Sequence, residues 1–143
     1  MAEQVTPDTP RPLVELVWEH DLVFAGHSGV VKMTLDSASA AGPSPMQALA
    51  FALAGCMAMD VVHVIKKGRY DLRGLRADLS GTRASADPHR FTSIALHFTV
   101  NGDVPAAKID RAIELSRDKY CSVWHSMRHD IDFSVTHSVT TGV

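Results

Sequence analysis

A long uncharged stretch constrains this chain more than any other feature. Residues 37–59 contain no Asp, Glu, Lys, Arg or His. Gly42, Pro43 and Pro45 interrupt the first part, which leaves about fifteen helical residues before Asp60, fewer than the roughly 20 that cross a bilayer. We therefore predict a helix buried in protein and no membrane span.

The predicted helix is apolar on almost every side. Between Met46 and Ile65 its only strongly polar side chains are Gln47, Asp60 and His63. A helix with this pattern must be covered all round. Because one domain of 143 residues has too little chain to surround it, we expect a second copy of the chain to provide the rest of the cover.

The helix has clear signals at both ends. Ser44 can cap it, Pro45 suits the first helical position, and Gln47 can complete a capping box with Ser44. The basic side chain of Lys67 is favourable near the negative end of the helix, and Gly68 is a typical terminator. The sequence therefore predicts a helix from Pro45 to about Lys67.

Alternation of apolar and polar side chains predicts strands on both sides of this helix. The predicted elements are strands at 14–19, 22–25 and 30–35, the last two joined through 27–29; strands at 75–80 and 94–100 with a turn at 84–90; a turn at 101–103; a helix opened by Pro105; a short helical turn at Cys121; and a strand at 131–139. Without regular βαβ alternation, this order predicts an α+β fold. We expect a single domain over residues 1–143, with 1–12 as a flexible tail.

Charge and composition exclude some functions. The formal net charge is −2, so there is no basic excess to neutralise phosphates, and nucleic acid is not an expected partner. The first residues lack the basic segment and apolar core of a secretory signal. We expect a cytoplasmic protein, where structural disulfides are uncommon.

The two cysteines are the first candidates for chemistry. Cys56 lies in the middle of the long helix, and Cys121 lies near the start of a helical turn. Free backbone N–H groups and Lys119 close in sequence favour a thiolate at Cys121. The pair can cycle through a disulfide, or both can be small apolar side chains in the core.

A polar face of the long helix supplies further candidates. Cys56, Asp60, His63 and Lys67 follow one another at helical spacing along one side. They can bind a metal with a ligand from elsewhere, or His63 can order Asp60 while Asp60 tunes Cys56, or they can form an exposed polar stripe. A carboxylate alone raises the pKa of a thiol, so an active Cys56 needs a positive group nearby. No H-x-x-x-H or C-x-x-C pair appears together with partners at zinc spacing, and the spacing of four between Cys121 and His125 is only suggestive. We predict no metal and no cofactor.

Two segments of this sequence resemble the OsmC/Ohr family. They are Gly-Pro-Ser-Pro-Met-Gln at 42–47 followed by Leu-Ala-Gly-Cys at 53–56, and Ser-Arg-Asp-Lys-Tyr-Cys-Ser at 116–122. The resemblance spans nearly the whole chain, including the order of strands and the spacing of the cysteines. It implies an intertwined homodimer with two long central helices between sheets.

The resemblance also implies an activity, the thiol-dependent reduction of organic hydroperoxides in the response to oxidative stress. Cys56 would attack the peroxide and become a sulfenic acid, Cys121 would condense with it to a disulfide, and an external dithiol would restore both. Met46, Met57 and Met59 can line an apolar pocket near Cys56, which would favour fatty or aryl hydroperoxides.

The sequence departs from the family pattern in one respect. Well-characterised members use an arginine before the long helix to activate the first cysteine, and a glutamate near the start of that helix to hold the arginine. Here the only arginine before Cys56 is Arg11, and Met46 or Gln47 occupies the glutamate position. Arg128 or a residue of the other subunit would have to substitute. This departure favours an alternative function, a non-catalytic dimer that binds an apolar ligand or senses redox state.

Overall fold

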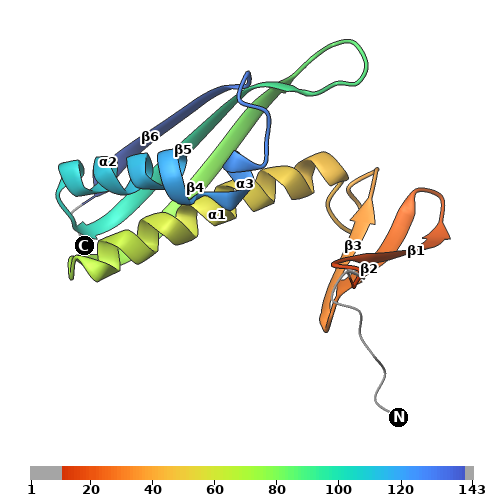
Figure 1. Cartoon of the computed structure of the whole chain (residues 1–143), viewed down its shortest axis with the longest axis horizontal. Coiled ribbons are helices and arrows are strands. Elements are labelled where there is room, and N and C mark those ends of the chain that lie inside the picture. The colour runs from red at the N-terminus through yellow and green to blue at the C-terminus, as the bar shows by residue number, and fades with distance from the viewer. Residues whose placement is uncertain (1–10, 141–143) are drawn as a thin grey trace. The chain divides into compact units, whose positions relative to one another are not determined.

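The computed structural model describes residues 11–140, so most of the predicted tail lies outside the described residues. The elements, labelled in Figure 1, are β1 (Glu15–His20), β2 (Val23–Ser28), β3 (Val31–Asp36), α1 (Pro45–Lys67), β4 (Asp71–Arg83), β5 (Phe91–Asp103), α2 (Ala106–Leu115), η1 (Ser116–Tyr120), α3 (Ser122–His125) and β6 (Asp132–Thr140). The α+β class predicted from the sequence is confirmed. The chain forms two compact units that divide within α1, between Leu49 and Ala50.

The first unit contains an antiparallel sheet in the order β1-β2-β3. Residues at the predicted connection, His27 and Ser28, instead pair with Lys32 and Val31, so the turn is tighter than the sequence indicated. Large apolar side chains of this unit remain at least 45% exposed within the single chain: Leu13, Val14, Leu16, Val17, Trp18, Leu22, Val30, Val31 and Met33.

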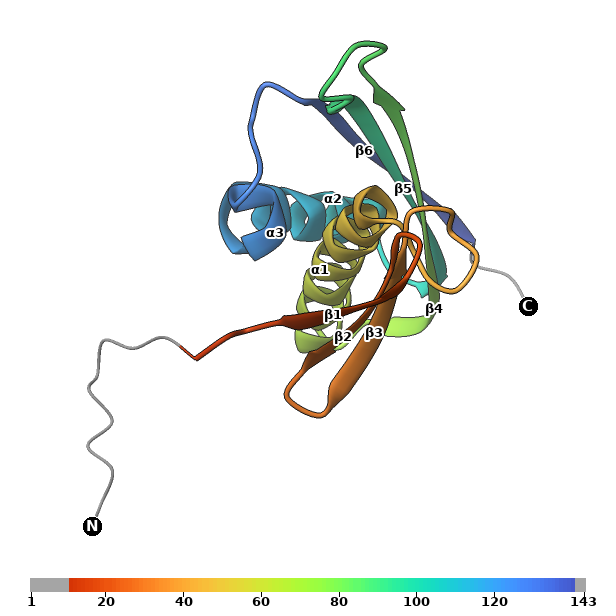
Figure 2. The ribbon, with the colours of Figure 1, turned by 90° about the vertical axis from the view of Figure 1, so that its right-hand side faces the viewer.

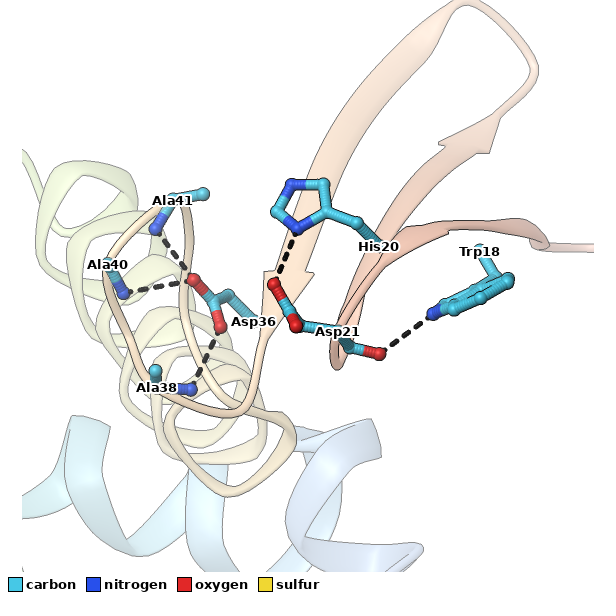
Figure 3. A network of polar contacts seen from close by, with 7 residues as sticks. All are labelled: Trp18, His20, Asp21, Asp36, Ala38, Ala40 and Ala41. Carbon is cyan, nitrogen blue, oxygen red and sulfur yellow. Dashed lines mark hydrogen bonds and ion pairs between the residues drawn. The ribbon is translucent and has the colours of Figure 1, made fainter.

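The loop that enters α1 is organised around one buried carboxylate. Asp36 accepts hydrogen bonds from the backbone N–H groups of Ala38, Ala40 and Ala41, at 2.9, 3.3 and 2.9 Å, as Figure 3 shows. The same close-up shows Trp18 donating through Nε1 to the backbone oxygen of Asp21. Three donated hydrogen bonds favour the charged form, so they lower the pKa of Asp36.

The predicted start of α1 is confirmed in detail. The Gln47 N–H donates to Ser44 Oγ at 3.2 Å, and the Ser44 N–H donates to Gln47 Oε1 at 2.9 Å. The same Gln47 oxygen accepts from Ser39 Oγ at 2.7 Å. This is a capping box, and it ties the loop to the first turn of the helix.

The second unit packs helices on one face of a sheet ordered β4-β5-β6. β4 and β5 are antiparallel, whereas β6 runs parallel to β5 because α2 and the segment after it cross over between them. Figures 1 and 2 show α2 and the part of α1 in this unit on the same side of the sheet. The core combines side chains of these elements, among them Met57, Ile65, Leu96, Phe98 and Ile109.

Within this chain, α1 buries only one stripe of its surface. Leu53, Met57, Val61 and Ile65 are at most 1% exposed, whereas Phe51 and Met59 are 72% and 74% exposed. By length and composition alone the helix could cross a membrane, since its most apolar 18 residues have a mean hydropathy of 2.0. The cover that the sequence demands on all sides is therefore not supplied by the described residues of one chain.

The prediction of a turn at residues 101–103 is wrong. Asn101, Gly102 and Asp103 continue β5 and pair with Gly74, Leu72 and Asp71. The glycine is required there because it has a φ of +146°, and a Cβ would lie 2.1 Å from the Asp71 backbone oxygen. The glycine of this segment therefore allows two strands to approach closely and does not reverse the chain direction.

Candidate active site

Two of the candidate side chains come from α1. Cys56 and Asp60 lie one turn apart, so they project from the same side of the helix, and both are half-buried. Neighbouring positions 53, 57 and 61 are in the core, which fixes the rotation of this part of the helix against the sheet.

The second cysteine is positioned by a change of helix type. α2 continues into η1, a π-helical turn in which the Cys121 N–H donates to the Ser116 backbone oxygen at 2.7 Å. Single π-helical turns are rare in proteins, and those that occur often lie at functional sites. The turn ends at Cys121, which caps α3 and accepts a hydrogen bond at Sγ from the Trp124 N–H at 3.4 Å.

These segments bring two thiols and a carboxylate together. The sulfurs of Cys56 and Cys121 and a carboxylate oxygen of Asp60 lie within 4.8 Å of one another. Ser116 adds a polar contact, since its Oγ donates to Asp60 Oδ2 at 2.7 Å. The sulfurs stand 65 positions apart in the sequence and meet because η1 turns the chain after α2 back toward α1.

The surroundings of Cys121 oppose ionisation. Burial of the thiol raises its pKa to about 11; Cys56 and the negative charge of Asp60 act in the same direction, and the Trp124 N–H only partly offsets them. The predicted thiolate at Cys121 is therefore wrong, because desolvation outweighs the free N–H groups. Lys119 does not help either, since it is exposed with its Nζ 5.2 Å from the centre of the Tyr120 ring.

Arg128 of this chain, a candidate for the cation beside Cys56, is paired with another carboxylate. Its guanidinium is bonded to Asp130, with Nε 2.6 Å from Oδ1. Between residues 11 and 140, no Lys, Arg or His forms an ion pair with Asp60. Arg117 lies over the Phe133 ring, 5.1 Å from its centre. Within the described part of one chain the two thiols therefore sit beside a carboxylate without a paired cation.

The remaining predicted residues lie elsewhere. His63 is exposed and lines a shallow apolar depression with Ala58, Met59, Val62 and Lys66. Its ring nitrogens are not part of the group formed by the two sulfurs and the carboxylate. Gln47 is committed to the capping box, and Met46 is half-buried in the first unit.

Sequence reasoning missed Ser116 as a site residue. Ser116 follows Ile109, Ala112 and Ile113 at helical spacing, and it is 0% exposed. A hydroxyl at a position with core periodicity was the available signal, because a buried hydroxyl needs a partner. Trp124 was also missed; it is buried, stacks on His129 and packs against Phe133, so it supports the wall behind Cys121.

The fold and the paired thiols define a class, α+β proteins with one cysteine on a long helix and a second brought beside it. The family model for OsmC-like proteins matches residues 36–136. The chain is 37% identical over 124 residues to Protein YhfA of Escherichia coli strain K12. The aligned region covers 85% of this chain and 91% of that protein. This chain belongs to the OsmC-like family.

Solved structures share the fold. A hypothetical protein from Aquifex aeolicus VF5 superposes with a TM-score of 0.84 at 24% identity, covering 92% of this chain and 98% of that one. The organic hydroperoxide resistance protein OhrB of Bacillus subtilis superposes with a TM-score of 0.58 at 18% identity, covering 87% and 97%. At these identities the likeness concerns the fold alone.

Proposed function

We propose that this protein reduces organic hydroperoxides with its two thiols, Cys56 attacking the peroxide and Cys121 resolving the product. The observation that supports this function is the approach of the two sulfurs to within 4.8 Å. A disulfide bond of about 2.0 Å then requires only a local movement. Family membership supports a redox function of this general kind.

Exposure supports the assignment of roles. Cys56 is half-buried and can be approached from outside, whereas Cys121 is 0% exposed. The Cys56 sulfur attacks one peroxide oxygen and the O–O bond breaks, which gives a sulfenic acid and an alcohol. The Cys121 sulfur then displaces the hydroxyl as water, and the thiol proton leaves with it. An external dithiol returns two electrons and two protons to the disulfide.

Exposed apolar surface supports a homodimer. Phe51 and Met59 on α1 are more than 70% exposed, and the β1-β2-β3 sheet leaves large apolar side chains uncovered. Patches of this extent mark interfaces, and a second copy is the partner the sequence predicts. We propose an intertwined dimer in the cytoplasm that meets neither membrane nor nucleic acid.

The test uses the reduced full-length protein and cumene hydroperoxide. We expect two thiols consumed per peroxide and an internal Cys56–Cys121 disulfide, detected by mass spectrometry of peptides. Cys56→Ser should abolish turnover, and Cys121→Ser should leave a sulfenic acid that dimedone traps. His63→Ala, on the same helix outside the thiol group, is the matched control and should turn over normally. Thiols that stay reduced in the presence of peroxide would exclude the proposal.

A second candidate function is binding of an apolar ligand. The first unit contains an apolar groove of about 360 Å³. It is lined by Val14, Leu16, Gly26, His27, Ser28, Val31, Met33, Leu35, Pro45 and Ala48. The missing arginine–glutamate pair favours this candidate. Native mass spectrometry that finds a co-purified lipid on protein whose thiols do not react with peroxide would support it over peroxide reduction.

A further inference from the structure

We propose that the reduced site binds a thiophilic divalent metal ion, with Zn²⁺ as the natural class, through the two sulfurs and Asp60. The three ligand atoms come from α1 and from the end of η1 and lie within 4.8 Å of one another. Zinc binds sulfur at about 2.3 Å and carboxylate oxygen at about 2.0–2.2 Å, which separates tetrahedral ligands by roughly 3.5–3.8 Å. A small inward movement of side chains therefore brings all three atoms to bonding distance.

The ligands would also balance the charge of a bound divalent ion. Asp60 has no ion-pair partner among residues 11–140, and metal binding adds the charges of two thiolates beside it. A divalent ion neutralises most of that charge at the point where it accumulates. The reaction is balanced as one ion bound and two thiol protons released, because thiolates are the metal ligands.

Neighbouring donors hold the ligands in place. Ser116 Oγ donates to Asp60 Oδ2 at 2.7 Å, and the Trp124 N–H donates to Cys121 Sγ at 3.4 Å. Each contact uses one lone pair and leaves others free for a metal. Outer partners of this kind orient metal ligands and typically account for about 10–100-fold in affinity.

The carboxylate separates this proposal from disulfide chemistry alone. Two thiols suffice to form a disulfide, and a negative group beside them gives that reaction no charge stabilisation. Thiolates and carboxylates are both zinc ligands, and three protein ligands leave a fourth position for water or substrate. The geometry therefore fits an ion-binding group as well as a dithiol.

One consequence rests on the proposed peroxide reduction. An organic hydroperoxide that oxidises the metal-bound dithiolate takes two electrons from the sulfurs and two protons from solvent and becomes an alcohol and water, while a disulfide forms and the ion leaves as M²⁺. Metal occupancy would thus regulate the same thiols that react with peroxide.

The test titrates reduced, chelator-treated full-length protein with Co²⁺ and then displaces it with Zn²⁺. We expect one ion per chain, a thiolate-to-cobalt charge-transfer band, and loss of that band in Cys56→Ser and Cys121→Ser. Asp60→Asn should weaken binding at least ~10-fold, and Ser116→Ala about 10–100-fold. His63→Ala should bind as the wild type does. Circular dichroism verifies the fold of each variant.

If a variant does not fold, a measurement on the wild-type protein still tests the proposal. The ¹¹³Cd NMR shift of the cadmium form should report two sulfur ligands. Absence of a charge-transfer band, a shift without sulfur ligation, or unchanged affinity in folded Asp60→Asn would each overturn the proposal. Peroxide reduction without any metal binding would support the proposed function and contradict the metal site. Metal binding without peroxide reduction would support the metal site and contradict the proposed function.

Discussion

At the scale of single residues, the environment of Cys121 is the most consequential. Burial, Cys56 and Asp60 together raise its pKa to about 11, so the group is a neutral thiol at neutral pH. A buried neutral thiol is consistent with the resolving role proposed for Cys121, because it does not itself react with peroxide.

Alkylation of metal-free protein checks this state of Cys121. We expect its rate of reaction with iodoacetamide, followed by peptide mass spectrometry, to rise with pH with a midpoint at about 11. In Asp60→Asn the midpoint should move to lower pH, since the carboxylate is one of the causes that raise it. A midpoint below the ordinary thiol value of 9.0 in the wild type would contradict the buried setting.

The same shift has a consequence for stability. The unfolded chain ionises the thiol near 9.0, and the folded chain only near 11. The unfolded state therefore releases its proton first, and the free energy of unfolding should fall as pH rises between these values and then level off. Urea denaturation of wild type and Cys121→Ala across this range isolates the contribution, because the variant lacks the titrating group.

At the scale of elements, the start of α1 is held by a reciprocal pair of hydrogen bonds. Ser44→Ala removes the oxygen that accepts from the Gln47 N–H. We expect a loss of about 0.5–2 kcal/mol in the free energy of unfolding, as for other lost N-caps. Chemical denaturation measures it, and Ser44→Asp, which restores an acceptor, should recover most of the loss.

The loop before α1 should give the protein an acid-sensitive contact. The backbone N–H groups of Ala41, Ala38 and Ala40 lower the pKa of Asp36 below the ordinary value of 3.8. Its contribution is therefore present above that value and lost as pH falls through the lower folded pKa. Asp36→Asn should be less stable than wild type at pH 7, and the difference should shrink below pH 3.8 in thermal unfolding. A constant difference would mean that the charge is unimportant.

The elements that the sequence predicted are those with strong local signals. The limits of α1 followed from Ser44, Pro45, Gln47 and the terminal lysines, each acting within one turn of the chain. The π-helical turn before Cys121 could not be predicted. Its hydrogen bond joins residues five positions apart, and that spacing depends on how the segment packs against the rest of the fold. Gly102 was misassigned for the same reason, since its close approach to Asp71 is set by strand pairing.

The candidate site was predictable only in part. Helical spacing placed Cys56 and Asp60 on one side, but it placed His63 there equally well. Spacing cannot report exposure, and His63 remains in solvent while Cys121 occupies the position beside the carboxylate. The ionisation of Cys121 was predicted with the wrong sign because desolvation depends on burial, which no single stretch of sequence encodes.

At the scale of the whole molecule, the apolar character of α1 is only half explained by one chain. Its buried stripe packs in the core, and Phe51 and Met59 remain 72% and 74% exposed. Soluble monomers rarely leave such side chains uncovered together with an exposed apolar sheet. The proposed second copy would cover both surfaces.

Sedimentation equilibrium in detergent-free buffer tests this assembly. We expect a mass of twice the 15.5 kDa of one chain. Phe51→Glu removes about 1.5–3 kcal/mol of apolar burial for each side chain and places a charge in the contact. The dissociation constant of the dimer should therefore rise at least ~10-fold. Ser80→Glu, on an exposed strand position of the polar sheet face, is the matched control and should leave the mass unchanged. A folded wild-type monomer at all concentrations would contradict the dimer.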